Sequence, residues 1–166
     1  MFENNILGAV LAGGKSKRFG DDKSQFKLEG KLLIDYILSE IKDEFEEILV
    51  VSNNQINFDK SEKITLIEDH KKGLGPLGGV LSAMKWVKNN NKDYKWISTF
   101  PTDTPFFKRS ILQKFLQGIK FEESKLFFIK SNNTRHNIFG LWSIDLMEKL
   151  EEDLNRGERK VEMWAN

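Results

Sequence analysis

The fold of this 166-residue chain is decided near its start by the stretch Ile6-Leu7-Gly8-Ala9-Val10-Leu11-Ala12-Gly13-Gly14. Residues 6–11 form an apolar run, which is typical of a strand buried on both faces of a sheet. Paired glycines follow, and they let the backbone pass close to a ligand because they carry no Cβ. Backbone N–H groups freed at such a turn can point at anionic oxygens. The stretch therefore predicts a buried strand that ends in a phosphate-binding loop.

The same loop carries the positive charge that a polyphosphate needs. Arg18 and Lys23 follow the glycines within a few residues. Guanidinium and ammonium groups complement phosphate oxygens, the first as a planar fork and the second as a point charge. We therefore expect the loop to hold a nucleoside triphosphate.

Two familiar phosphate motifs compete for the glycines, and neither fits. A P-loop ending at Gly14 would need a glycine at position 9, where the chain has Ala9. Residues 73–78 match the spacing of a dinucleotide fingerprint, but residues 69–72 separate them from the preceding apolar run, and Pro76 removes a donor amide. The spacing alone therefore identifies neither motif.

Apolar runs alternate with segments of helical periodicity along the chain. This alternation predicts a single-domain α/β protein with a Rossmann-like, mostly parallel sheet and helices on both faces. Ligands of such sheets bind outside the carboxyl ends of the strands, where Gly13, Asp69 and Asp103 are expected. Asn132-Asn133 predicts a hairpin turn. The expected strands are 6–11, 47–51, 64–67, 96–100, 126–129 and 138–142, and the expected helices are 32–41, 77–87 and 111–116.

Composition limits the class of protein. With 39% hydrophobic residues, the chain can bury a core of its own. A net charge of +1 argues against a nucleic-acid surface, and the lack of cysteine excludes a thiol nucleophile or a cysteine metal site. No apolar stretch has the length of a signal peptide core or a membrane span. We expect a cytoplasmic protein that binds neither nucleic acid nor membrane.

The motifs, taken in order along the chain, resemble those of the molybdenum cofactor guanylyltransferases. These are MobA-like nucleotidyltransferases with the fold of the nucleotide-diphospho-sugar transferases. The resemblance covers nearly the whole chain, and its first, third and fourth blocks together are specific. The matching blocks are Leu11-Ala12-Gly13-Gly14-x-Ser16-x-Arg18-Phe19-Gly20-x-Asp22-Lys23, Glu68-Asp69, Gly75-Pro76-Leu77-Gly78-Gly79, Pro101-x-Asp103-x-Pro105-Phe106, His136 with Gly140-Leu141-Trp142, and Gly157-Glu158-Arg159.

The resemblance implies Mg²⁺-dependent transfer of GMP from GTP to the phosphate of molybdopterin, with or without molybdenum, and release of pyrophosphate. GTP and molybdopterin are then the small-molecule partners, and protein partners in molybdenum cofactor delivery are compatible with this role. Such a reaction leaves little covalent work to the protein, which positions the reactants and neutralises charge.

The resemblance also implies roles for single residues. Lys23 is expected beside the α- and β-phosphates, Arg18 beside the β- and γ-phosphates, and Asp103 on Mg²⁺; these three form the catalytic set. Asp103 also has a plainer interpretation as a turn residue before Thr104-Pro105. His136 is expected on the acceptor side. The residues expected to bind GTP are Leu11, Ala12, Gly13, Gly14, Lys23, Asn54, Asp69, Gly75, Gly78 and Asp103.

Other interpretations stay open at this point. The Asn53-Asn54 pair suits either a nucleotide contact or a turn, and Trp142 suits core packing. Asn137 stands where the family commonly has proline, and the family's final strand and helix are expected to be absent. Within the class, a molybdopterin cytidylyltransferase or a sugar-phosphate nucleotidyltransferase is the alternative. From a different class, a nucleotide-binding module without turnover is the alternative.

Overall fold

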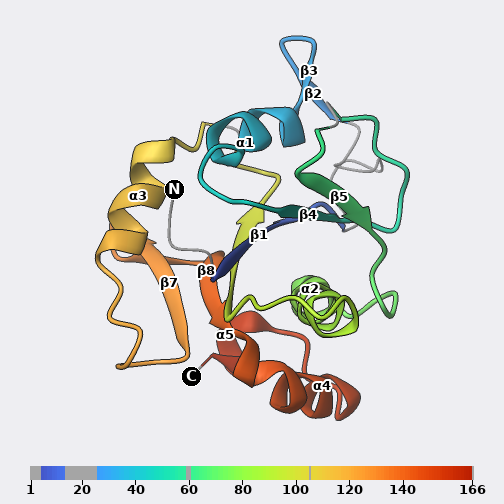
Figure 1. Ribbon diagram of the computed structural model, residues 1–166, viewed down its shortest axis with the longest axis vertical. Coiled ribbons are helices and arrows are strands. Elements are labelled where there is room, and N and C mark those ends of the chain that lie inside the picture. The colour runs from blue at the N-terminus through green and yellow to red at the C-terminus, as the bar shows by residue number, and fades with distance from the viewer. Residues whose placement is uncertain (1–4, 14–25, 59–60, 105, 166) are drawn as a thin grey trace.

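Six strands form one sheet in the order β5-β4-β1-β6-β8-β7 (Figure 1). The computed structural model describes residues 5–13, 26–58, 61–104 and 106–165. Neighbouring strands among β1, β4, β5 and β6 pair in parallel, whereas β8 is antiparallel to both β6 and β7. The mostly parallel sheet is therefore confirmed. The strands are β1 (Ile6–Leu11), β4 (Ile48–Val51), β5 (Ile64–Ile67), β6 (Trp96–Pro101), β7 (Leu126–Ser131) and β8 (Thr134–Ser143).

Helices cover both faces of this sheet, as the alternation predicts. One core cluster joins the sheet to α1 (Leu33–Ile41) and α3 (Arg109–Gln117), and a second joins it to α2 (Pro76–Asn89) and α4 (Met147–Asn155). Successive side chains of a strand point to opposite faces, so β1 contributes alternate residues to the two clusters. Within the described ranges, each helix is too short or too polar to cross a bilayer.

Several elements differ from the predicted ones in their bounds or were not predicted. β8 begins at Thr134, nearer the turn than expected, because Asn132 and Asn133 both adopt positive φ angles of 46° and 61° and so let pairing start at once. A small hairpin, β2 (Lys27–Leu28) with β3 (Lys31–Leu32), is too short to show alternation. The helix α4, the short helix α5 (Val161–Trp164) and a 3-10 turn at Ile144–Leu146 add to the expected elements.

The four parallel strands end level with one another. Leu11 is paired with Val51 on one side and Pro101 on the other, and Val51 is paired with Ile67. From β1 the chain continues to β4 and β5 on one side, and then returns to β6 on the other side. The carboxyl ends of β1 and β6 therefore form the switch point at which open α/β sheets bind ligands.

An ionic cluster connects α1 to α3 on one face of the sheet. Arg109 Nε lies 3.3 Å from the buried carboxylate of Glu44, and its Nη2 lies 2.7 Å from Asp43. Gln113 also donates to Glu44, at 3.0 Å. Because Glu44 is only 5% exposed, these side chains take the place of water around its carboxylate.

Arg109→Ala is expected to destabilise the protein by about 1–3 kcal/mol, because it leaves the Glu44 carboxylate buried without its cation. The estimate lies below the cost of breaking a fully buried pair, since the Arg109 side chain is 38% exposed. Urea denaturation measures the change. Arg156→Ala is the control, since Arg156 is 73% exposed and makes ion pairs at 3.8 Å, and it is expected to change stability by less than about 0.5 kcal/mol. Equal changes in the free energy of unfolding for both variants would show that the ionic cluster stabilises the fold no more than an exposed ion pair does.

Candidate active site

Four candidate residues occupy equivalent positions beyond the level strand ends. Asp69, Asn53, Gly13 and Asp103 each lie two residues after the paired row of Ile67, Val51, Leu11 and Pro101. We call these four residues the terminal row. The ladder of hydrogen bonds continues one residue beyond the paired row, towards the terminal row, since the amides of Ala12 and Ser52 donate to neighbouring strands at 2.9 Å. The fold thus brings together residues that are far apart in the sequence.

Asp69 lies at the β5 end of the terminal row and has two side-chain partners. Asn53 Nδ2 donates to its Oδ2 at 3.3 Å, and Ser82 Oγ lies 3.4 Å from its Oδ1. The Ser82 hydroxyl also accepts from the His70 amide and donates to the Gly78 carbonyl, both at 2.8 Å. Burial raises the pKa of the Asp69 carboxyl, and the hydrogen bonds from Ser82 and Asn53 oppose that rise. Asp69 is therefore part of a network that joins β4, β5 and α2.

Two glycines pack against the Asp69 carboxylate. A Cβ added to Gly13 would lie 3.3 Å from Asp69 Oδ2, and a Cβ added to Gly79 would lie 3.7 Å from Oδ1. The first glycine comes from the loop after β1, and the second from the first turn of α2. The carboxylate thus lies where the two glycine-rich motifs of the sequence meet.

The second glycine-rich motif, residues 75–79, forms the entrance to α2. Gly75 precedes the helix with φ +67°, which favours glycine, and Pro76 is the first helical residue. A Cβ on Gly78 would lie 2.6 Å from the Leu74 Cβ. Gly78 is therefore required sterically, whether or not it contacts a nucleotide.

Asp103 lies at the opposite end of the terminal row, after β6, and is exposed to solvent. Within the described part of the chain, no three histidine, aspartate or glutamate side chains are grouped to hold a metal ion. A Mg²⁺ ion that a triphosphate already binds needs only one or two protein carboxylates. An exposed carboxylate at the switch point suits that requirement.

Other expected GTP-binding residues divide into two groups. Gly14, Arg18 and Lys23 lie outside the described residues, so their roles stay predictions. Leu11 and Ala12 are buried at the end of β1, where the Ala12 amide already donates to Val51.

Asn54 is exposed, and the structure brings Asn53, not Asn54, to Asp69. The sequence does contain a signal for this. Residues two apart on an extended strand share a face, so Asn53 follows Val51 onto the face that α2 covers.

The expected acceptor-side residues lie on β8. His136 is exposed, and its Nε2 lies 2.7 Å from the Ser131 hydroxyl across the hairpin. Asn137, which stands in place of the family's proline, donates to Glu162 of α5 at 2.9 Å. Trp142 is fully buried and donates to Thr99 Oγ1 at 2.8 Å, which confirms that it belongs to the core.

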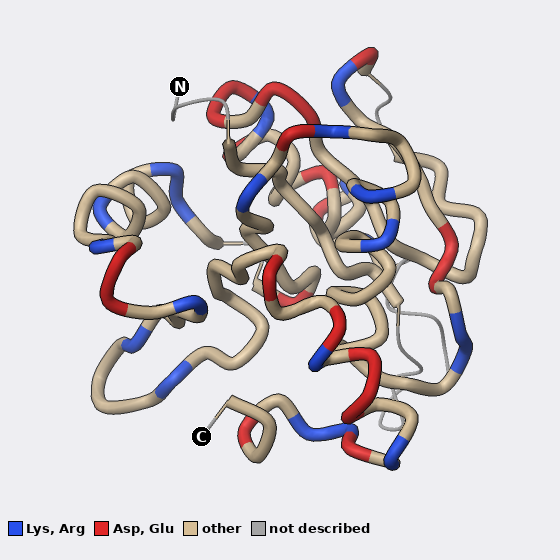
Figure 2. Tube along the Cα trace, turned by 60° about the horizontal axis from the view of Figure 1, so that its bottom comes forward, with Lys and Arg blue, Asp and Glu red and all other residues tan. Residues whose placement is uncertain are grey.

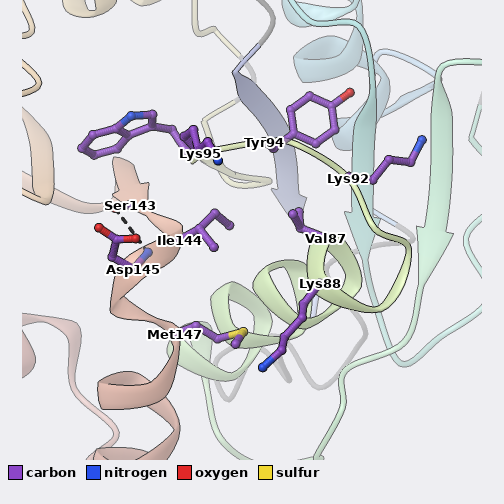
Figure 3. Close-up of a pocket in the computed structure, with 10 residues that line it drawn as sticks. Val87, Lys88, Lys92, Tyr94, Lys95, Ser143, Ile144, Asp145 and Met147 are labelled. Carbon is purple, nitrogen blue, oxygen red and sulfur yellow. Dashed lines mark hydrogen bonds between the residues drawn. The ribbon is translucent and has the colours of Figure 1, made fainter.

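A cavity of about 420 Å³ lies at the amino end of β6, the end away from the terminal row (Figure 3). Its lysines do not converge: Lys88 and Lys92 point away from each other, and Lys92 pairs with Glu47 at 2.9 Å. Burial and the nearby Glu47 carboxylate raise the pKa of Tyr94, which keeps this phenol neutral. The cavity therefore has no convergent polar groups of the kind that bind a ligand.

Acidic and basic residues are interspersed along the described chain (Figure 2). The full sequence has 26 Lys and Arg against 25 Asp and Glu, which gives the net charge of +1.

A family model described as the MobA-like NTP transferase domain matches residues 8–165. Two relatives carry the name molybdenum cofactor guanylyltransferase. The protein from Nitrobacter hamburgensis is 28% identical, with 95% of this chain and 77% of the relative covered. The protein from Shewanella sp. (strain MR-4) is 31% identical, with coverage of 96% and 79%. The crystal structure of molybdopterin-guanine dinucleotide biosynthesis protein A from Archaeoglobus fulgidus has a TM-score of 0.72 at 22% identity, and covers 95% of this chain and 77% of that one, which shows a shared fold.

Proposed function

The chain belongs to the MobA-like NTP transferase family, and on that basis we propose that it transfers GMP from GTP to the phosphate of molybdopterin. The proposal rests on the names of its relatives and on one structural observation. The terminal row contains a carboxylate held by Asn53, a glycine and an exposed carboxylate, each two residues beyond the carboxyl end of its strand. A nucleotide bound along this edge would have its base near Asp69 and its phosphates near Asp103.

The reaction is an in-line substitution at phosphorus. A phosphate oxygen of molybdopterin attacks the α-phosphorus of GTP, the bond from that phosphorus to the bridging oxygen breaks, and pyrophosphate leaves with the bond's electrons. The attacking phosphate monoester is largely ionised at neutral pH, so no dedicated general base is needed. The protein therefore acts by positioning the reactants and neutralising charge.

Nucleotidyltransferases of this family typically use a divalent metal ion, and we assign Mg²⁺ to this chain. Asp103 is the residue that would hold it, since its carboxylate is exposed at the switch point. The bound ion would neutralise charge on the phosphates. Lys23 is assigned to the α- and β-phosphates and Arg18 to the β- and γ-phosphates, on the strength of the family motif.

Guanine suits the Asp69 end of the terminal row. An ionised carboxylate only accepts hydrogen bonds, and guanine presents adjacent N–H donors at N1 and N2. Adenine and cytosine place an acceptor beside the donor on the corresponding edge, so they match a carboxylate less well. We therefore assign base recognition to Asp69.

The acceptor would approach the Asp103 end of the row. Phe106 follows Asp103 closely and is 77% exposed, so it offers an apolar surface there to the pterin ring. His136 remains the family-based candidate for a polar contact to the acceptor.

GTP is expected to bind about 10- to 100-fold more tightly than ATP or CTP, because each polar partner lost from a base edge costs about 1–3 kcal/mol. Calorimetric titration of the three nucleotides with Mg²⁺ measures this. Pyrophosphate release with molybdopterin then tests turnover.

Each alternative function gives a different result in these assays. Tighter CTP binding would identify a cytidylyltransferase, and release of pyrophosphate with sugar phosphates alone would identify a different acceptor. GTP binding without turnover would identify a nucleotide-binding module. Equal affinity for all three nucleotides would rule out base recognition by Asp69.

A further inference from the structure

The two polar atoms of the Asn53 side chain have unequal surroundings. Its Nδ2 donates to Asp69 Oδ2 at 3.3 Å. Its Oδ1 is buried and accepts no hydrogen bond from the described residues. Rotating the amide by half a turn would bring Oδ1 towards Asp69 Oδ2, and an ionised carboxylate repels a second acceptor. The amide of Asn53 is therefore oriented so that it donates to Asp69, while its own Oδ1 stays without a hydrogen bond from the described residues.

Ser82, the other partner of Asp69, has its proton engaged elsewhere. A serine hydroxyl has one proton to donate, and the Gly78 carbonyl lies nearer to Ser82 Oγ, at 2.8 Å, than Asp69 Oδ1 does, at 3.4 Å. Among the described residues, the amide of Asn53 is thus the side-chain donor dedicated to Asp69. It directs the carboxylate towards Gly13, where no Cβ stands in the way.

We propose that Asn53 is a positioning residue whose side-chain amide holds the Asp69 carboxylate oriented over Gly13, ready to accept hydrogen bonds from a bound nucleotide. This inference rests on the nucleotide role proposed for Asp69. Asn53 itself is not required to touch the nucleotide.

Charged groups near Asp69 are directed elsewhere in the described structure. Lys85 of α2 lies 3.1 Å from the His70 ring and pairs with Glu151 of α4. Glu68, the preceding residue, is exposed. Burial raises the pKa of Asp69, and the contacts with Ser82 and Asn53 both oppose that rise. Loss of the Asn53 donor should therefore raise the pKa of Asp69. On acidification, the carboxylate would then become protonated at a higher pH than in the unchanged protein.

The first test follows the carboxyl carbon of Asp69 by NMR during a pH titration of the nucleotide-free protein. Asn53→Ala is expected to raise the pKa of Asp69. Asn53→Asp keeps the shape of the side chain and should raise the pKa of Asp69 further, because two carboxylates this close share a proton. This variant is measured in place of Asn53→Ala if the alanine variant fails to fold. Asn89→Ala, an exposed asparagine at the end of α2, is the matched control. An unchanged pKa in both Asn53 variants would overturn the proposal.

The second test measures GTP affinity and turnover. Asn53→Ala is expected to weaken GTP binding about tenfold at neutral pH, with kcat nearly unchanged and the acidic limb of the affinity profile moved to higher pH. In an Asp69→Asn background the same substitution should add nothing, because its effect passes through Asp69. A full tenfold loss in that background would overturn the positioning role.

The two tests also distinguish this inference from the proposed function. If the pKa of Asp69 moves as expected, but neither Asn53→Ala nor Asp69→Asn changes GTP affinity, then Asn53 does hold the carboxylate. The nucleotide role of Asp69 would fail in that case.

Discussion

Asp103→Asn is expected to lower turnover by about 10³-fold while moving the Tm by no more than about 2 °C. The substitution keeps the shape of the side chain and removes the negative charge that would hold Mg²⁺ beside the phosphates, and loss of one such electrostatic contact commonly costs two to three orders of magnitude. Asp103 is exposed, so the folded state should lose little. Pyrophosphate release measured over a range of Mg²⁺ concentrations, with thermal unfolding of the same samples, gives both quantities.

Asp93→Asn is the matched control, because Asp93 is an exposed aspartate in the loop before β6, at the opposite end of that strand from Asp103. It should retain full turnover. If Asp103→Asn instead loses stability while its folded fraction turns over normally, Asp103 is a turn residue and the metal assignment is wrong.

Gly78→Ala is expected to destabilise the protein by about 2–3 kcal/mol, the upper part of the range for overpacking a core, and to abolish measurable GTP binding. The new Cβ would lie 2.6 Å from the Leu74 Cβ, whereas carbon atoms in contact lie about 3.5–4.0 Å apart. Leu74 is buried and cannot turn aside, so the start of α2 must move. That movement would displace the Gly78 carbonyl from Ser82 and Gly79 from the Asp69 carboxylate.

Thermal unfolding and GTP calorimetry on Gly118→Ala provide the comparison. A Cβ on Gly118 would lie 3.5 Å from its nearest neighbour, an ordinary contact, and its φ of −83° suits alanine. This variant should be neutral or slightly more stable. If Gly78→Ala behaved in the same way, the entrance to α2 would be looser than the contact with Leu74 implies.

The continuous apolar run Ile6–Leu11 was sufficient to predict β1 with its observed bounds. The shorter strand at Ile64–Ile67 also has the predicted bounds, and the paired asparagines turn the hairpin as expected. The two-residue strands β2 and β3 could not be predicted, because alternation needs a longer run. For α4 a signal is present, since Met147, Leu150 and Leu154 recur at helical spacing and are buried, although this helix is not among the predicted ones.

The candidate site was predictable in part. The edge of the sheet that brings Gly13, Asp69 and Asp103 into one row follows from strand order and chain direction. The two-residue period of a strand indicates which face Asn53 shares with Val51, but the contacts that Asn53 and Ser82 make with Asp69 could not be derived in this way. They depend on which side chain reaches the Asp69 carboxylate from a neighbouring strand or helix, and that requires the register between elements.

The strand ends that lead into the terminal row have a fixed spacing. Neighbouring strands lie about 4.8 Å apart, so the three intervals from β5 to β6 separate the ends of these two strands by about 14 Å. Main-chain hydrogen bonds between the paired strands set this spacing. If Asp69 recognises the base as proposed, substitutions at Asp69 and Asn53 should change the preferred base without moving the end of β6 that precedes Asp103. Under that proposal, redesign towards another nucleotide should begin at the β5 end of the terminal row.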